Sequence, residues 1–331
     1  MSSSVSSSTD FTHQTVLLQE TVASVLGVKT LDGLKKKSAG TYVDATFGRG
    51  GHSRLLLEHL AEDARLIVFD KDPQAIATAN ELAQQDSRVT VVHESFATLI
   101  DSLVKLEVDK VDGIMADLGV SSPQLDDGSR GFSFMRDGVV DMRMDTSRGQ
   151  SVGEWLTGVE EETLANVLYE FGEERHSRRI ARAIKQMESY DSTLELAEVI
   201  KQAHPKWQKG KHPATQSFQA MRIFINNELG DIDRFLDQSI DILAKDGMLA
   251  VISFHSLEDR RIKQFFQKHS RGQYPQDEHL PIQPQRPKYF AKPKRIAPSK
   301  AEIKANQRSR SAWLRAAKRT NIPRQKELEK T

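Results

Sequence analysis

The chain has 331 residues, no cysteine and a formal net charge of +1, and its hydrophobic content of 38% is enough to build a buried core. This composition excludes a chain that is disordered throughout, and the missing cysteine excludes disulfides, thiolate metal sites and cysteine nucleophiles. No apolar run approaches the roughly 18 residues of a membrane span, and the amino terminus lacks a secretion signal, so we expect a cytoplasmic protein with no membrane contact.

The amino-terminal residues divide into a low-complexity tail and a first helix. Residues 1–12 are rich in serine and have too few apolar side chains to offset the entropy of ordering, so we expect them to be disordered. From His13 onward we expect ordered structure. Apolar residues recur at near-helical spacing over 14–26, and Gly27 ends the pattern as a carboxyl-terminal cap would.

An alternation of short β-rich runs and helical patterns follows. The expected strands are 41–46, 65–70, 88–93, 111–117 and 248–254, and the helices between the first three are 53–60 and 73–84. Strands that alternate with helices form a parallel sheet covered on both faces. The fold class that we predict is therefore α/β, with a doubly wound, Rossmann-like sheet.

About 130 residues separate the fourth expected strand from the fifth, far more than a crossover needs. Residues 126–221 contain turns and then helical patterns, so we predict an inserted all-helical domain, with 13–125 and 222–331 forming the main domain. One long helix over 215–243 is expected to return the chain to the sheet. Ser256 and Asp259 have the spacing of a capping box and predict a helix that ends near His269.

The positive charge is concentrated near the carboxyl terminus. Residues 286–324 contain 13 Lys or Arg residues and one acid, Glu302, so the remainder of the chain has 34 basic and 45 acidic residues. Such a segment is typical either of a solvated tail or of a contact with a polyanion, because neutralised phosphates release counterions. Tyr289, Phe290 and Trp313 lie among the basic residues and favour nucleic acid.

The first expected strand leads into a glycine-rich turn that immediately precedes a helix. Gly48, Gly50 and Gly51 allow a ligand to approach the backbone closely, and the helix amino terminus offers unpaired N–H groups. Asp70 ends the next strand, where a carboxylate can accept hydrogen bonds from ribose hydroxyls. The pattern indicates a nucleoside cofactor. Because Ser53 stands where a dinucleotide motif has its third glycine, it favours S-adenosylmethionine over a nicotinamide or flavin dinucleotide.

Asp117 ends the fourth expected strand, at the sheet edge where open α/β folds bind ligands. A carboxylate that follows an apolar strand and precedes a glycine is typical of a residue that faces a site, although a turn or capping role gives the same pattern.

With these motifs in place, the chain resembles the ribosomal RNA small-subunit methyltransferase H family, which methylates the exocyclic N4 of a cytidine in the decoding centre of 16S rRNA. The resemblance runs from His13 to Trp313. It is carried by His13–Leu18, Thr46–Ser53, Asp70–Ile76, Asp117–Asp126, Arg130–Arg136, Asp141–Asp145, Tyr169–Arg175, His212–Thr215 and Ser253–Arg260.

The resemblance implies an S-adenosyl-L-methionine-dependent rRNA (cytosine-N4)-methyltransferase with no metal, whose partner is the small ribosomal subunit. No obligatory protein partner is implied, and a homodimer is compatible with it. Transferred residue by residue, the donor pocket would be Gly50, Gly51, His52, Asp70, Phe96, Asp117 and Gln124.

Methyl transfer to an exocyclic amine needs an acceptor for an amino proton, and Asp117 is the predicted catalytic residue. Related motifs place a base-stacking aromatic residue where this chain has Val120, so Phe132 and Phe134 are candidates for stacking, unless they only pack the insertion onto the sheet. His255 and His212 are further candidates for contact with the base, unless their hydrogen bonds have a structural role.

Arg175, Arg178, Arg179 and Arg182 share one helical face, which is more often a solvated face than an RNA contact.

Three other functions remain open at this point. A nicotinamide oxidoreductase would bind its dinucleotide. A non-catalytic ribosome assembly factor with a methyltransferase fold would bind rRNA and transfer nothing. A methyltransferase acting on DNA or on another RNA would share every donor-site residue and differ in substrate alone.

Overall fold

The computed structural model describes residues 15–34, 37–205, 212–274, 279, 281 and 284–324. The predicted disorder of 1–12 and the start of order at His13 lie outside these residues.

The described residues form one seven-stranded sheet with the order β3-β2-β1-β4-β5-β7-β6. The strands are β1 Thr41–Asp44, β2 Arg65–Asp70, β3 Val89–His93, β4 Val111–Asp117, β5 Leu243–Ser253, β6 Lys294–Ile296 and β7 Trp313–Lys318. Strands β1 to β5 pair in parallel, which confirms the predicted doubly wound sheet. The strand order reverses between β1 and β4, and ligands bind at such a switch point in open α/β sheets.

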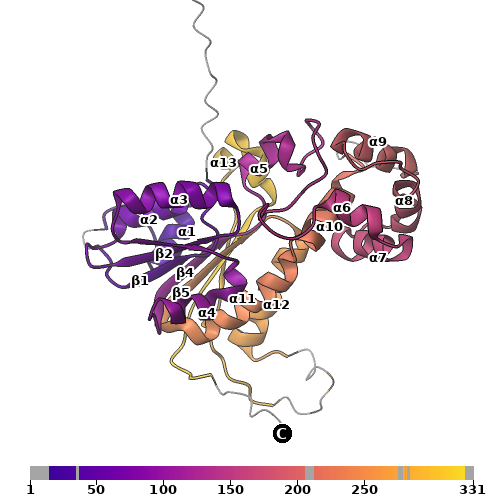
Figure 1. The fold of residues 1–331 in the computed structure, drawn as a ribbon. Coiled ribbons are helices and arrows are strands. Elements are labelled where there is room, and N and C mark those ends of the chain that lie inside the picture. The colour runs from indigo at the N-terminus through magenta and orange to yellow at the C-terminus, as the bar shows by residue number, and fades with distance from the viewer. Residues whose placement is uncertain are drawn as a thin grey trace, which may run out of the picture.

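Helices cover both faces of this sheet, and a separate group of helices lies beside it (Figure 1). Those near the sheet are α1 Leu18–Val25, α2 Gly51–His59, α3 Pro73–Gln85, α4 Leu99–Lys105, α5 Ser122–Asp126, α11 Glu228–Ile242, α12 Ser256–Arg271 and α13 Lys300–Ala305. Those of the separate group are α6 Val152–Gly158, α7 Glu161–Gly172, α8 Ser177–Ile184 and α9 Thr193–Ala203, and α10 Thr215–Ile225 joins the group to the sheet.

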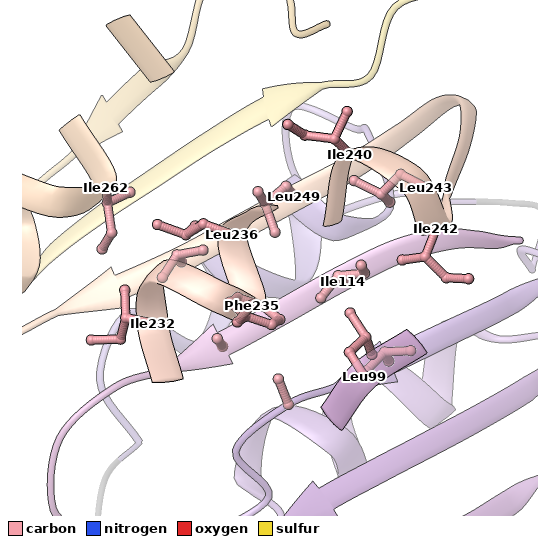
Figure 2. Close-up of a cluster of buried hydrophobic side chains, with 14 of the residues drawn as sticks. Leu99, Ile114, Ile232, Phe235, Leu236, Ile240, Ile242, Leu243, Leu249 and Ile262 are labelled. Atoms are coloured by element: carbon pink, nitrogen blue, oxygen red, sulfur yellow. The ribbon is translucent and has the colours of Figure 1, made fainter. Parts of the chain in front are cut away.

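Alternate residues of each central strand pack into two different hydrophobic clusters, as the two-residue period of a strand requires. Ile114 of β4 packs with Leu99 of α4 and Phe235 of α11 on one face, and Figure 2 shows these side chains converging. Met115, the next residue, packs with Val22 of α1 and other residues on the opposite face. Burial of the strands on both faces fixes where their carboxyl ends lie, and the candidate site is at those ends.

A third hydrophobic cluster lies within the inserted region and is built from α6 to α10 and the chain that precedes them. Trp155, Leu168, Ile180 and Ile200 are among its buried members. The insertion therefore has its own hydrophobic core. The exact boundaries at 126 and 221 stay a prediction.

The prediction of one long helix over 215–243 is wrong, because α10 ends at Ile225 and α11 begins at Glu228. Asn227 has a left-handed backbone with φ 51°, which interrupts a right-handed helix. The Asn226 amide donates to the Met142 carbonyl at 2.7 Å and accepts from the Met144 amide at 2.7 Å. The break thus allows Asn226 to hold the loop of the insertion that precedes α6.

The capping box is also shifted by one residue from its predicted position. Helix α12 begins at Ser256 as expected, but its cap is His255, and the Glu258 carboxylate accepts from the amides of Phe254 at 2.8 Å and His255 at 3.2 Å. Asp259 instead forms a two-pronged ion pair with Arg315 of β7, at 2.7 and 3.0 Å.

The basic carboxyl-terminal segment is part of the sheet. Strand β7 pairs antiparallel with both β5 and β6. Arg319 is buried, and its guanidinium donates to the carbonyls of Ile240 at 3.0 Å and Tyr289 at 3.1 Å. Truncation after Arg286 would therefore remove two strands, and it cannot be used to test whether the segment binds RNA.

The two ends of the chain are joined above the glycine turn. Glu302 of α13, the one acid of the basic segment, accepts a hydrogen bond from the Leu17 amide at 2.7 Å. This bond holds Thr15 and Val16 in place beside the first turn of α2, where both residues line the cavity described below.

No helix within the described part of the chain is both long and apolar enough to cross a lipid bilayer.

Candidate functional site

A cavity of about 370 Å³ opens at the carboxyl ends of β1, β2, β4 and β5. This volume is in the range of small-molecule sites. Its lining includes six of the seven residues predicted to bind the methyl donor, namely Gly51, His52, Asp70, Phe96, Asp117 and Gln124. Gly50 lies directly beside them as the residue that caps α2.

The glycine turn brings the backbone to the cavity in a conformation that side chains would disturb. Gly50 has φ 76°, in the left-handed region that favours glycine. A Cβ atom on Gly51 would lie 2.0 Å from Thr15 Oγ1, so no larger residue fits there. The cavity is therefore lined by bare backbone at this turn.

Asp70 ties the glycine turn to the end of β2. Its carboxylate accepts hydrogen bonds from the amides of Gly48 at 2.7 Å and Asp72 at 2.9 Å. Burial raises the pKa of Asp70. Each oxygen accepts one backbone hydrogen bond and has further acceptor capacity, so the carboxylate can also accept from ribose hydroxyls.

Gln124 lines the cavity, but its amide also holds neighbouring loops together. Its nitrogen donates to Asp72 Oδ2 at 2.9 Å, and its oxygen accepts from the Ser121 amide at 2.9 Å. Arg130 donates to the same Asp72 oxygen at 2.8 Å. Phe96 presents a half-buried ring, which packs edge-on against Phe235 with centroids 5.3 Å apart.

Asp117 lies at the end of β4 with its backbone fixed and one side-chain oxygen unused. Its amide donates to Thr46 Oγ1 at 2.6 Å, whereas its buried Oδ1 atom has no hydrogen-bond partner. Burial, together with the charges of Asp44 and Glu258, holds the pKa of Asp117 well above its usual range. The side chain is nevertheless 26% exposed, so its other oxygen, Oδ2, can accept from a donor group brought by a ligand.

His52, in the first turn of α2, lies between the amino-terminal segment and Asp117. Its Nε2 atom is 3.2 Å from the Val16 carbonyl oxygen, and its Nδ1 atom is 3.8 Å from Asp117 Oδ2. Burial lowers the pKa of His52 to about 4, so the imidazole is neutral near pH 7.

A buried ionic network borders the cavity, and four of its members were not predicted as a group. Arg222 of α10 donates to both oxygens of Glu228 at 2.8 Å, and His255 Nε2 is 3.1 Å from Glu258 Oε1. Burial alone would raise the pKa of Glu258, but His255 and Arg222 outweigh it and lower that pKa. The spacing of three residues between His255 and Glu258 is the one part of this network that the sequence could indicate. Arg222 and Glu228 lie on two other helices, α10 and α11, and meet the pair only in the fold.

Glu228, His255 and Glu258 place their ligand atoms within 4.8 Å of one another, the one such group among the described residues. Both Glu228 oxygens are already bound to Arg222, so a guanidinium supplies the positive charge at this position. We assign no metal to this group.

The aromatic residues proposed for base stacking do not line the cavity. Phe132 is buried in the cluster of the insertion, and Phe134 packs against His212 and Phe218 with centroids 4.5 and 4.9 Å apart. These contacts favour the packing alternative for both phenylalanines. His212 is likewise absent from the lining, whereas His255 is part of it.

The arginines of the predicted basic face are exposed on and beside α8. Arg182 lies 3.5 Å from Glu161, which is consistent with a solvated face.

Comparison with known proteins gives consistent results over nearly the whole chain. The MraW methylase family matches residues 10–320. The ribosomal RNA small subunit methyltransferase H of Psychrobacter sp. is 75% identical over 96% of this chain and 94% of its own length. The protein of the same name from Acinetobacter baumannii is 57% identical over 93% of this chain and 97% of its own length.

Among solved structures, a putative rRNA-methylase from Clostridium thermocellum covers 86% of this chain and 90% of its own, with 13% identity and a TM-score of 0.40. A similarity of this size adds nothing to the argument about function.

Proposed function

The chain belongs to the MraW methylase family, and from that premise we propose that it transfers a methyl group to the exocyclic N4 of a cytidine in the decoding region of 16S rRNA. It is an S-adenosyl-L-methionine-dependent rRNA methyltransferase of the α/β class. The observation that carries the choice of an exocyclic amine is the carboxylate of Asp117 in the cavity wall, whose side chain is 26% exposed and whose buried Oδ1 atom has no hydrogen-bond partner.

The residues of the cavity fit the methyl donor. The bare backbone at Gly51 permits close approach, Asp70 can accept from a ribose, and the carboxylates of Asp44, Asp117 and Glu258 supply negative charge for a cationic sulfonium. The donor, when bound, supplies a methyl group that is activated by the positive sulfur. We propose that Gly50, Gly51, His52, Asp70, Phe96, Asp117 and Gln124 hold it.

Asp117 is the proposed catalytic residue. The amino lone pair of cytosine is delocalised into the ring, and a carboxylate that accepts a hydrogen bond from the amino group helps to localise it. As the nitrogen gains its methyl group, it must lose a proton, and Oδ2, the exposed oxygen of Asp117, can accept that proton. A raised pKa makes the ionised form of Asp117 a stronger base for this task.

We further propose that the enzyme acts in the cytoplasm on the small ribosomal subunit. The inserted helical region, 126–221, is proposed as a separate domain that meets the substrate beside the cavity. A homodimer is compatible with this arrangement and is left to measurements of mass in solution.

Methyl transfer from labelled S-adenosylmethionine to small subunits that lack the modification tests the proposal. We expect label on N4 of a single cytidine, mapped by mass spectrometry. Asp117→Asn is the matched control and should transfer methyl at least roughly 100-fold more slowly. Label on a different nucleic acid would change the substrate, and donor binding without any transfer would identify a non-catalytic assembly factor.

A further inference from the structure

His52 has a polar neighbour on each side of its ring, an arrangement that donor binding alone does not explain. His52 is 6% exposed, and its ring separates the Val16 carbonyl from the Asp117 carboxylate. A residue that only formed part of a binding surface would have no need of polar partners on both sides of its ring.

The Val16 contact determines which ring nitrogen of His52 bears the hydrogen. A carbonyl oxygen can only accept a hydrogen bond, so Nε2 must donate across the 3.2 Å contact. In the neutral imidazole the other nitrogen, Nδ1, then has a lone pair and no hydrogen. This lone pair belongs to the atom that lies 3.8 Å from Asp117 Oδ2.

The two oxygens of Asp117 consequently have different surroundings. Oδ1 is buried without a partner, whereas the side chain as a whole is 26% exposed, so Oδ2 is the oxygen that the amino group of the target base can reach. Oδ2 lies near a nitrogen that can only accept. An ionised Asp117 cannot form a hydrogen bond with that nitrogen, because both atoms are acceptors. An Asp117 that bears a proton on Oδ2 can donate a hydrogen bond to Nδ1.

We infer that His52 is a positioning residue for Asp117: its Nδ1 atom accepts a hydrogen bond from the proton that Asp117 takes from the exocyclic amine. The inference rests on the proposed function, since it assumes that Asp117 is the acceptor. The separation of 3.8 Å exceeds a hydrogen bond, and contacts of this kind tighten in the reacting complex.

The step balances in atoms and electrons. The amino nitrogen forms its bond to the methyl carbon, and the carbon–sulfur bond breaks with its electron pair remaining on sulfur. The N–H electron pair returns to nitrogen, and the proton passes to the Asp117 carboxylate, which becomes neutral. His52 stays neutral throughout, and its Nδ1 atom accepts a hydrogen bond from the proton that Asp117 then holds.

Other charged groups near Asp117 do not offer the same acceptor. Asp44 of β1 and Glu258 of α12 are carboxylates whose charges oppose ionisation of Asp117. Asp44 already accepts hydrogen bonds from Ser53 at 2.6 Å and the Thr46 amide at 3.1 Å, and Glu258 accepts from two backbone amides. Arg222, beyond Glu258, carries only donors.

Two substitutions test the roles of the two ring nitrogens of His52 separately. In His52→Gln, the terminal amide reaches the place of Nε2 and can still donate to Val16, but the acceptor near Asp117 is lost. In His52→Asn, the shorter amide retains an acceptor near the place of Nδ1 and loses the bond to Val16. The pair of variants therefore tests one role at a time.

The experiment measures kcat and KM for methyl transfer to small subunits across pH, together with donor affinity by calorimetry. For His52→Gln we expect kcat at saturating donor to be reduced about five- to tenfold, as one hydrogen bond implies, in addition to the loss of donor affinity that it shares with His52→Asn. The acidic limb of the kcat profile should move to lower pH by up to about one unit, because the protonated form of Asp117 is no longer stabilised.

For His52→Asn we expect the acidic limb to stay at its wild-type pH. Loss of donor affinity in both variants with an unchanged kcat profile would overturn the inference and leave His52 as a donor-binding residue. If wild type places no label on cytidine N4, the proposed function fails instead, and the two failures are thus distinguishable.

Discussion

Asp70 and Asp117 line the cavity half-buried, Asp44 is buried beside them, and the surroundings of each carboxylate give it a different task. Asp70 is held by two backbone amides, Asp44 by Ser53 and Thr46, and Asp117 has one oxygen without a partner. Since all three have raised pKa values, the site favours a cationic ligand, whose charge offsets the repulsion among them.

Asp70→Ala should weaken donor binding by about 1–3 kcal/mol, because the ribose hydroxyls lose their acceptor. Calorimetry with S-adenosylmethionine measures the change. The substitution also releases the amides of Gly48 and Asp72, so the thermal midpoint should be recorded beside the affinity. Asp86→Ala is the control: Asp86 pairs with Arg88 away from the cavity and should leave donor affinity unchanged.

Asp44→Asn should change how stability depends on pH. Burial raises the pKa of Asp44 to about 6, above its value of roughly 4 in an unfolded chain. Between these values the folded state holds the proton more tightly, so wild type loses stability as pH rises from about 4 through 6. Urea unfolding measures this change. Between pH 4 and pH 7 the free energy of unfolding should fall by roughly 2–3 kcal/mol more in wild type than in the variant.

Asp86→Asn provides a control of opposite sign for that measurement. Its bond with Arg88 lowers the pKa of Asp86, so its contribution to stability is present at neutral pH and lost on acidification. Equal pH dependence in wild type and Asp44→Asn would show that Asp44 is not the titrating group.

The residues near the glycine turn could be predicted because strand, turn and helix are contiguous in the sequence. Asp70 and Asp117 followed from the rule that parallel strands meet a ligand at their carboxyl ends. The Arg222–Glu228 pair and the contact of His52 with Val16 could not be predicted, because they depend on how separate helices and the amino-terminal segment pack.

At the scale of elements, the break between α10 and α11 has a structural role that the apolar spacing of the sequence does not indicate. Apolar spacing continues through 215–243, so the pattern predicts one helix. The break appears only through Asn226, which binds the loop at Met142 and Met144, and through the left-handed backbone of Asn227. Strand β7 was not predicted for a similar reason, since Arg315 interrupts its apolar pattern and finds its partner, Asp259, on α12.

Asn227→Ala should destabilise the fold by about 1–2 kcal/mol, because alanine is strained at φ 51° and the bond from the Asn227 amide to Asp231 is lost. Asn227→Gly loses the same bond without the backbone strain, so it should lower the free energy of unfolding by a smaller amount. Chemical unfolding of both variants provides the measurement. Equal losses would mean that the side-chain bond, and not the backbone, maintains the break.

At the scale of the whole molecule, the basic segment has two uses. Some of its cations are bound within the fold, such as Arg315 to Asp259 and Arg319 to backbone carbonyls. Others are exposed on α13, including Lys300 and Lys304, close to the η4 turn, Gln307–Ser311, whose Arg308 and Ser311 line the cavity. Composition alone predicts the charge, and only the fold separates the two groups.

Replacing Lys300 and Lys304 by Gln should weaken RNA binding and reduce the slope of log affinity against log salt concentration by about 1.5, as loss of two phosphate contacts implies. Filter binding of 16S rRNA over a range of salt concentrations measures this slope. The matched control is Lys105→Gln with Lys245→Gln, which removes the same charge from exposed positions outside the cavity lining. Equal slopes for the two double variants would contradict a role for α13.

The hydrogen bond between the Leu17 amide and Glu302 joins two segments that are 285 residues apart in the chain. The Val16 carbonyl that orients His52 is adjacent to this bond. A chain folded only as far as β5 would have the glycine turn and Asp117, without Glu302 to hold the segment beside them. The wall of the cavity at Thr15 and Val16 therefore depends on a contact between distant parts of the sequence, which forms only after α13 has packed.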